Sequence, residues 1–256
     1  MSDKIALRKT SLTDYPGRIS SVLFFSGCNL RCPWCHNPEL VHGTKISDES
    51  FISIEEGLAH LRKRQSVLGG VVLSGGEPCL CEELGEIISE IKKLSQPVKL
   101  DTNGMCPSVL EELFRFPETR PDYIALDLKI APSRYIELLG SMTNTPREPP
   151  LVSLRLWEKK PGEDLKKSAE LIRNSGIAHE YRSLALPGGY FTEEDVEALS
   201  SLADSAPWYF RPFRGGNCLD PAWDNREESA EKAAEHIKSL AARARAMGKN
   251  TKEIIG

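Results

Sequence analysis

Short apolar runs alternate with segments of helical periodicity along most of the chain. Between the runs, apolar residues recur at a spacing of three and four, as they do over 84–94. A regular alternation of strand and helix predicts parallel βα units. We therefore predict strands at six runs, the first of which is mostly β-branched and aromatic: 19–25, 70–73, 98–100, 123–126, 179–186 and 208–213.

Local signals set the limits of several helices. Ser53 and Glu56 form a capping-box pattern, and Thr192 with Asp195 forms a similar one. Residues 131–160 are less regular and carry several prolines after a short helical pattern at 135–139, so we expect a surface excursion there. Further helices are predicted at 54–61, 84–94, 109–113, 163–174 and 227–247, the last a charged, alanine-rich terminal cover.

Polar or glycine-rich turns follow the strands at their C-terminal ends. They include Ser-Gly-Gly-Glu-Pro at 74–78, Asp-Thr-Asn-Gly at 101–104 and Asp-Leu-Lys at 127–129. Each turn alone is also compatible with a plain connection, a polar turn or an exposed salt bridge. Barrels of parallel βα units place their active sites at this end of the strands. The coincidence of these placements therefore indicates a functional site.

The most specific motif is the cysteine loop that follows the first strand. Cys28, Cys32 and Cys35 have the spacing C-x3-C-x2-C, and no fourth cysteine follows at similar distance. A cuboidal iron-sulfur cluster held here would keep one iron without a protein thiolate, open to a substrate or cofactor. A zinc site that adds His36 is the alternative, although structural zinc usually takes its ligands from two separated pairs.

Composition excludes several classes of protein. The 256 residues are 40% apolar and 27% charged, which is ordinary for a globular chain, and the net charge of −4 gives no case for nucleic-acid binding. No apolar stretch approaches membrane-spanning length, and residues 1–8 lack a signal-peptide core. Seven cysteines without a sign of secretion disfavour disulfides. We expect a cytoplasmic protein with no membrane partner.

The motifs together resemble a known family. The cysteine loop with Trp34 before its last cysteine resembles the signature of the radical S-adenosylmethionine (SAM) superfamily, and Cys-His-Asn-Pro at 35–38 resembles the glycyl-radical enzyme activating enzymes. Residues 9–18 are similar to the activating proteins of anaerobic ribonucleoside-triphosphate reductase. The resemblance implies a single-domain, partial (β/α)6 TIM-like barrel over 19–221, open along one side, with an N-terminal extension at 1–18 and a C-terminal helix at 222–256.

The resemblance also implies roles for individual residues. Cys28, Cys32 and Cys35 would hold a [4Fe-4S] cluster. The implied cofactor-binding residues are Trp34, His36, Gly75, Gly76, Glu77, Asp101, Asn103, Asp127, Lys129, Arg182 and Arg214. Trp34 and His36 would flank the adenine, and the two glycines would receive the amino group of SAM.

The charged side chains are expected to gather above the cluster. Because strand residues two apart share a face, Asp127 and Lys129 should point together. By resemblance, Lys129 would meet the cofactor carboxylate, Arg182 would reach inward, and Asp127 would help to build a site for a monovalent cation. Glu77 would converge with Asp127 and Lys129.

The implied activity is reductive cleavage of SAM to a radical that abstracts hydrogen from a glycine of a partner enzyme. That partner would be a glycyl-radical enzyme, with anaerobic ribonucleotide reductase first, and the electron donor a reduced flavodoxin or ferredoxin. Two alternatives stay open: a radical SAM enzyme for another peptide or a small molecule, and a zinc-stabilised interaction module without catalysis. The remaining cysteines are expected to be bystanders rather than ligands of a second cluster: Cys79, Cys81, Cys106 and Cys218.

Overall fold

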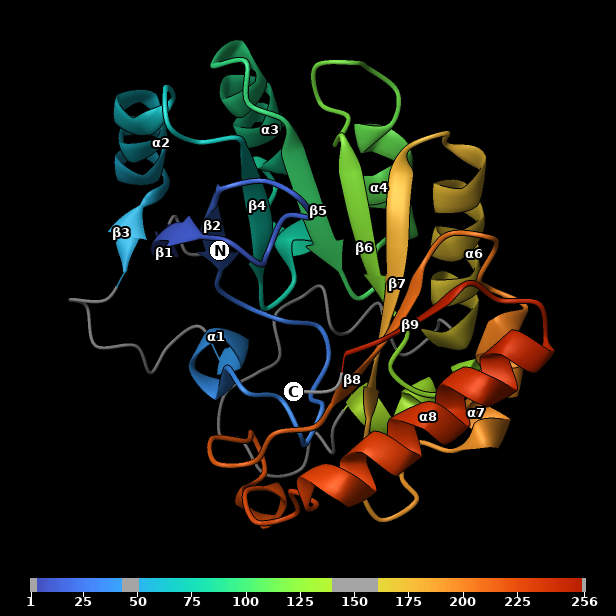
Figure 1. The fold of residues 1–256 in the computed structure, drawn as a ribbon. Coiled ribbons are helices and arrows are strands. Elements are labelled where there is room, and N and C mark those ends of the chain that lie inside the picture. The colour runs from blue at the N-terminus through green and yellow to red at the C-terminus, as the bar shows by residue number, and fades with distance from the viewer. Residues whose placement is uncertain (1–3, 43–50, 140–160, 255–256) are drawn as a thin grey trace.

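One twisted sheet of nine strands organises the chain, in the order β3-β1-β2-β4-β5-β6-β7-β8-β9 (Figure 1). The computed structural model describes residues 4–42, 51–139 and 161–254. All neighbouring pairs from β2 to β9 along this order are parallel. Only β1 against β2 and β3 against β1 pair antiparallel. The sheet ends at β3 and β9 without pairing them, so the described strands form a partial barrel.

The six predicted strands are confirmed, with small shifts at their ends. They are β2 (Ser20–Phe25), β4 (Gly70–Gly75), β5 (Val98–Thr102), β6 (Tyr123–Asp127), β7 (Ala178–Ala185) and β8 (Trp208–Pro212). Three strands were not predicted: β1 (Lys4–Ser11), β3 (Ile52–Ser53) and β9 (Thr251–Glu253). β1 is rich in lysine and arginine, and the other two are only two and three residues long, so none has an apolar run.

Helices follow the strands and pack along the outer face of the sheet (Figure 1). Both capping boxes are present, Ser53 with Glu56 and Thr192 with Asp195. The α-helices are α1 (Pro38–His42), α2 (Ile54–Arg64), α3 (Leu84–Lys93), α4 (Pro107–Leu113), α6 (Pro161–Asn174), α7 (Glu193–Ser200) and α8 (Ala230–Ala246). The 3-10 helices are η2 (Pro78–Leu80), η3 (Pro132–Leu139) and η4 (Pro221–Trp223).

The structure describes only the first part of the expected surface excursion at 131–160. The short helix expected at 135–139 is part of η3, whereas the rest of the expected surface excursion, 140–160, lies outside the described residues. In the described part of the chain, no helix has both the length and the apolar character needed to cross a membrane. Helix α8 packs against α7, β8 and β9.

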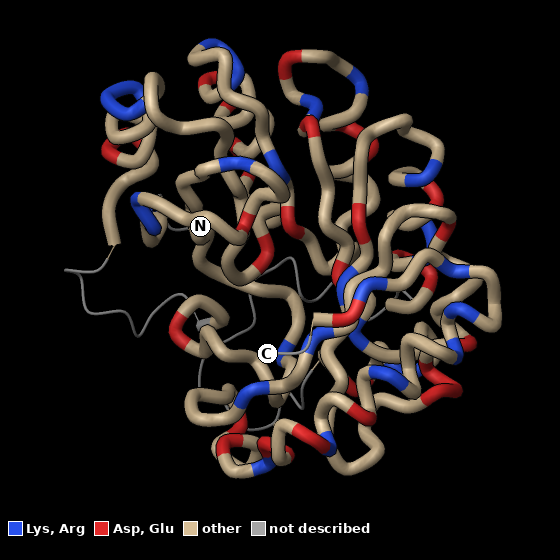
Figure 2. The backbone as a smooth tube through the Cα atoms, viewed as in Figure 1, with Lys and Arg blue, Asp and Glu red and all other residues tan. Residues whose placement is uncertain are grey.

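The two faces of the sheet differ in chemistry. The outer face carries fully buried apolar side chains such as Leu73, Leu100 and Leu126, which join the large core under the helices. The inner face carries a small apolar cluster in which Tyr15 packs with Val22 and Val72. Toward the C-terminal ends, the same inner face carries acidic and basic side chains, which Figure 2 shows as red and blue segments near the middle of the sheet.

Truncation of a side chain in the outer-face core should strongly destabilise the protein. We expect Leu73→Ala to reduce the free energy of unfolding of the metal-free protein by about 2–5 kcal/mol, because it leaves a cavity under fully packed helices. Leu12→Ala is the matched control, since Leu12 is 74% exposed and its replacement should change stability by less than about 0.5 kcal/mol. Urea denaturation measures both, and equal losses would contradict this assignment of the core.

Candidate functional site

The cysteine loop is anchored by backbone hydrogen bonds to distant segments. The amide of Gly27 donates to Leu40 O at 2.7 Å, and the amide of Arg31 donates to Leu138 O at 2.6 Å. The loop also accepts bonds from the segment after β8, at 2.9 Å from both Leu219 N and Asp220 N. Parts of the chain far apart in sequence thus fix the positions from which the three thiols project.

The environment of the thiols suits ligands of an iron-sulfur cluster. Burial raises the pKa of the Cys28 thiol to about 11 and that of Cys32 to about 12. The ammonium of Lys129 opposes burial at both sulfurs, and the Leu30 amide donates to Cys28 Sγ at 3.4 Å. Burial outweighs these two groups, so a cluster would displace the thiol protons on binding, and the Leu30 amide and Lys129 are the groups that would favour the resulting thiolates.

The zinc alternative finds no support in this arrangement. Among the residues that the structure describes, no three His, Cys, Asp or Glu side chains are grouped so as to hold one metal ion. A cubane places each thiolate on a different iron, so its three ligands lie farther apart than those of a single tetrahedral ion. The ring of His36 instead stacks on Phe213, with centroids 5.6 Å apart.

Two glycines bring the turn after β4 directly against the cysteine loop. Gly75 has φ of +122°, and a Cβ there would lie 2.4 Å from the backbone of Phe25. A Cβ on Gly76 would lie 2.1 Å from Gly27 O. Instead the Gly76 and Glu77 amides donate to Phe25 O and Gly27 O, at 2.9 and 2.8 Å. The two glycines therefore allow the turn after β4 to lie directly against the cysteine loop.

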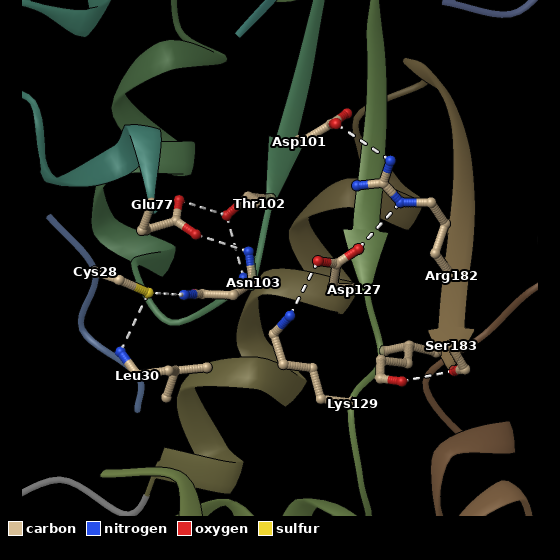
Figure 3. Close-up of polar contacts among 12 residues, drawn as sticks. Cys28, Leu30, Glu77, Asp101, Thr102, Asn103, Asp127, Lys129, Arg182 and Ser183 are labelled. Carbon is tan, nitrogen blue, oxygen red and sulfur yellow. Dashed lines mark hydrogen bonds and ion pairs between the residues drawn. The ribbon is translucent and has the colours of Figure 1, made fainter. Parts of the chain in front are cut away.

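Glu77 joins the turn after β4 to the turn after β5. Its side chain is 1% exposed and accepts hydrogen bonds from Thr102 Oγ1 at 2.9 Å and Asn103 N at 2.8 Å. Burial raises the pKa of this carboxyl, and the donors around it act in the opposite direction. Figure 3 shows Glu77 directed at these two residues, whereas Asp127 and Lys129 lie together elsewhere in the view. Glu77 and Lys129 both act electrostatically on Cys28, and Asp127 and Lys129 on Cys32, so all three charges lie near the thiols although Glu77 does not pair with the other two.

Asn103 links the turn after β5 to the cysteine loop. Its Nδ2 donates to Asn29 Oδ1 at 2.7 Å and lies 3.8 Å from Cys28 Sγ (Figure 3). Its Oδ1 accepts from the Met105 amide at 2.9 Å, which fixes the orientation of the amide group. Asn103 is therefore placed beside the thiols, as the sequence motif suggested, while the neighbouring Asp101 points to the inner face of the sheet.

Charged side chains from three strands form one connected network on the inner face (Figure 3). The Arg182 guanidinium bridges Asp101 at 3.1 Å and Asp127 at 3.0 Å, and Lys129 Nζ lies 3.1 Å from the other oxygen of Asp127. Burial alone would raise the pKa of Asp127, but Lys129 and Arg182 hold it well below its usual range. The predicted pairing of Asp127 with Lys129 is present.

Two members of this network were missed from the sequence. Lys99 is 1% exposed and pairs with Asp101, its neighbour two positions along β5. The hydroxyl of Ser74 donates to Asp101 Oδ2 at 3.2 Å. The rule that predicted the pairing of Asp127 with Lys129 also applies to Lys99 and Asp101, so the signal was present in the sequence.

Trp34 and His36, the two ring-bearing residues expected to bind the cofactor, pack against residues near and after β8. Trp34 is 3% exposed and packs against Tyr190 and Trp223, with ring centroids 5.2 and 5.4 Å apart. Trp223 also contacts Phe213, on which His36 stacks. These rings attach the segment after β8 to the cysteine loop.

Arg214 lies away from the charged network. Its side chain is 60% exposed and pairs with Glu227 at 3.2 Å. Arg211, three residues earlier, has a different position: β8 pairs Tyr209 with Arg182 and Arg211 with Leu184, so Arg211 shares the inner face with Arg182. In the described part of the chain its buried Nε has no hydrogen-bond partner. Arg211 is therefore a candidate for contact with an anionic group that the sequence analysis did not name.

This combination of a three-cysteine loop, strand-end turns and an inner charged face defines the class of protein. Residues 22–203 match the Radical SAM superfamily. The chain thus belongs to the radical SAM superfamily of enzymes.

Two relatives are similar to this chain over most of its length. A Methanocaldococcus jannaschii protein named "Putative glycyl-radical enzyme activating enzyme MJ1227" is 30% identical over 207 residues, covering 78% of this chain and 74% of the relative. The pyruvate formate-lyase-activating enzyme of Staphylococcus aureus is 28% identical over 235 residues, covering 79% of this chain and 92% of the relative.

Two solved structures show the same fold at low sequence identity. A radical SAM methyltransferase from Sphaerobacter thermophilus has a TM-score of 0.61 at 17% identity and covers 94% of this chain and 67% of that one. Streptococcus suis SuiB bound to S-adenosylmethionine has a TM-score of 0.60 at 13% identity, over 91% of this chain. The present chain spans about half (51%) of the length of SuiB.

Because the turn after β4 contacts the cysteine loop, alanine substitutions at Gly76 and at Gly85 should have very different effects on stability. We expect Gly76→Ala to cost at least about 3 kcal/mol of stability and to reduce iron incorporation, because its methyl group would overlap Gly27 O. Gly85→Ala in α3 is the control: its Cβ would meet only ordinary contacts, and alanine favours the helix by about 0.5–1 kcal/mol. Chemical denaturation and iron content after reconstitution measure the difference, and a stable, fully loaded Gly76→Ala protein would contradict it.

Proposed function

We propose that this protein activates a glycyl-radical enzyme by radical SAM chemistry. The observation that carries the proposal is the position of Lys129, which pairs with Asp127 and acts electrostatically on the thiols of both Cys28 and Cys32. The charged network thus acts electrostatically on the three-cysteine loop. The names of the two relatives support an activating function rather than another radical SAM reaction.

The cysteines would bind the cluster, and the charged network would bind the cofactor. Cys28, Cys32 and Cys35 would hold the [4Fe-4S] cluster, which supplies one electron to S-adenosylmethionine when bound. Lys129, whose ammonium acts electrostatically on Cys28 and Cys32, would receive the cofactor carboxylate. Asp127, held ionised by its two cations, would orient Lys129 rather than accept a proton. Glu77 and Asn103 would fix the two turns that border the cofactor.

An open edge of the barrel is consistent with a macromolecular substrate. The described sheet ends at β3 on one side and β9 on the other, and these strands do not pair with each other. A glycine-bearing loop of a partner must reach the inner face, and an unclosed sheet leaves a side for it to enter. The reaction would remove a hydrogen atom from that glycine.

The partner we propose is an anaerobic ribonucleotide reductase, in a reducing cytoplasm with reduced flavodoxin or ferredoxin as electron donor. Residues 9–18 support this choice by their resemblance to activating proteins of that enzyme. In the structure this segment ends β1 and forms a turn in which Ser11 Oγ accepts from the amides of Thr13 and Asp14, both at 3.3 Å. Leu12 at its tip is 74% exposed and is available for a partner.

Electron paramagnetic resonance tests the proposed function. The protein is reconstituted with iron and sulfide without oxygen, reduced, and mixed with S-adenosylmethionine and an anaerobic ribonucleotide reductase. A glycyl-radical doublet is expected in the reductase. Cleavage of the cofactor without a doublet would reject this partner in favour of another peptide or a small molecule.

Cysteine substitutions provide the matched pair for this test. Cys32→Ala should abolish the brown chromophore, cofactor cleavage and the glycyl radical together, since it removes one of three ligands. Cys81→Ala should leave all three largely unchanged, because Cys81 lies outside the loop, at the end of η2. If Cys81→Ala instead lowered the iron content by half, a second cluster would have to replace the assignment of Cys81 as a bystander.

A further inference from the structure

Asp127, which was expected to help build a monovalent-cation site, and its network neighbour Asp101 already have cationic partners from the chain. Asp101 contacts Lys99, Arg182 and the hydroxyl of Ser74. Asp127 contacts Arg182 through one oxygen and Lys129 through the other. An added metal cation would have to displace one of these partners. The residues present therefore do not fit the implied cation.

We propose that the buried ammonium of Lys99 takes the place of that cation and positions Asp101. Asp101 in turn holds one side of the Arg182 guanidinium, whose other side holds Asp127 beside Lys129. Lys99 is thus a positioning residue, connected through two carboxylates and one guanidinium to the ammonium that acts electrostatically on the thiols. It is the second residue of β5, two positions before Asp101.

The charge balance of the inner face supports this assignment. Glu180 is 3% exposed, accepts a hydrogen bond from Tyr123 OH at 3.0 Å, and acts electrostatically on Arg182. With it included, the three cations Lys99, Lys129 and Arg182 balance the three carboxylates Asp101, Asp127 and Glu180. Arg211 on the neighbouring strand β8 adds one more positive charge to the same face. A further cation would bring an unbalanced charge into a poorly solvated interior, where such charges are costly.

A tethered ammonium also has a different consequence from a bound metal ion. Lys99 is present at fixed stoichiometry, so the geometry of Asp101 should not depend on the salt in solution. A bound ion would instead stabilise the folded protein by mass action as its concentration rises. The two cases are therefore separated by a titration with sodium or potassium at constant ionic strength.

The first test uses the metal-free wild-type protein, so it does not depend on the partner enzyme or on the proposed activation reaction. Its melting temperature is measured in sodium, potassium and choline chloride at equal ionic strength. The three values should agree within about 1 °C, below the about 2–4 °C that 1 kcal/mol of binding would add in a chain of this size. A saturable rise with sodium or potassium would overturn the proposal.

The second test removes the ammonium in two ways. Lys99→Ala leaves space that a small cation can occupy, whereas Lys99→Met fills the space without charge. The melting temperature of Lys99→Ala should rise saturably by about 2–4 °C with sodium or potassium but not with choline. Lys99→Met should show no such rise. Lys92→Ala is the matched control, because Lys92 pairs with Asp122 at the outside of the sheet and should behave as wild type.

A cofactor-binding measurement connects Lys99 to the site. On the reconstituted protein, calorimetry should show S-adenosylmethionine binding weakened about tenfold or more by Lys99→Ala in choline chloride, and largely restored in potassium chloride. Lys99→Met should stay weak in both salts. Wild-type affinity in Lys99→Ala without any salt effect would overturn the positioning role. If Lys99→Ala does not fold, the wild-type titration and Lys99→Met still decide the question.

Discussion

Charges buried on the inner face of a sheet are tolerated only when they neutralise one another, and this constraint governs the centre of the molecule. Asp101, Asp127 and Arg182 come from β5, β6 and β7, and their mutual pairs require these strands to keep one register. A shift of one residue would turn each side chain to the outer face, among the buried leucines. The polar network therefore selects the strand alignment that also assembles the site.

A second constraint acts at the strand ends, where three turns must meet. Gly76 lies so close to Gly27 that no side chain fits between the two turns. Glu77 then binds the donors of the next turn, at Thr102 and Asn103, and Asn103 reaches back to Asn29 in the cysteine loop. These contacts form a closed ring of hydrogen bonds, so the position of the thiols depends on the turns of two other strands.

Much of the fold could be predicted from the sequence, because β2 and β4 to β8 carry apolar runs and capping signals mark α2 and α7. β1 escaped prediction because its lysines and arginines suppress the apolar pattern. In the site, residue types and locations were predictable, but the direction of Glu77 was not, since it depends on donors 25 residues away along the chain. Lys99 and Arg211 were overlooked because each charge lies inside or at the end of a run classified as a buried strand.

An aromatic cluster lies at the other end of the inner face and bears on how a ligand can reach the thiols. Tyr15 is 4% exposed, lies against Val22 and Val72, and has its ring centroid 6.0 Å from that of Tyr123. In the described residues, these side chains fill the inner face near the N-terminal ends of the strands. This packed aromatic and aliphatic cluster therefore covers the inner face at the end opposite the cysteine loop, so a ligand that reaches the thiols has to approach from the C-terminal ends of the strands.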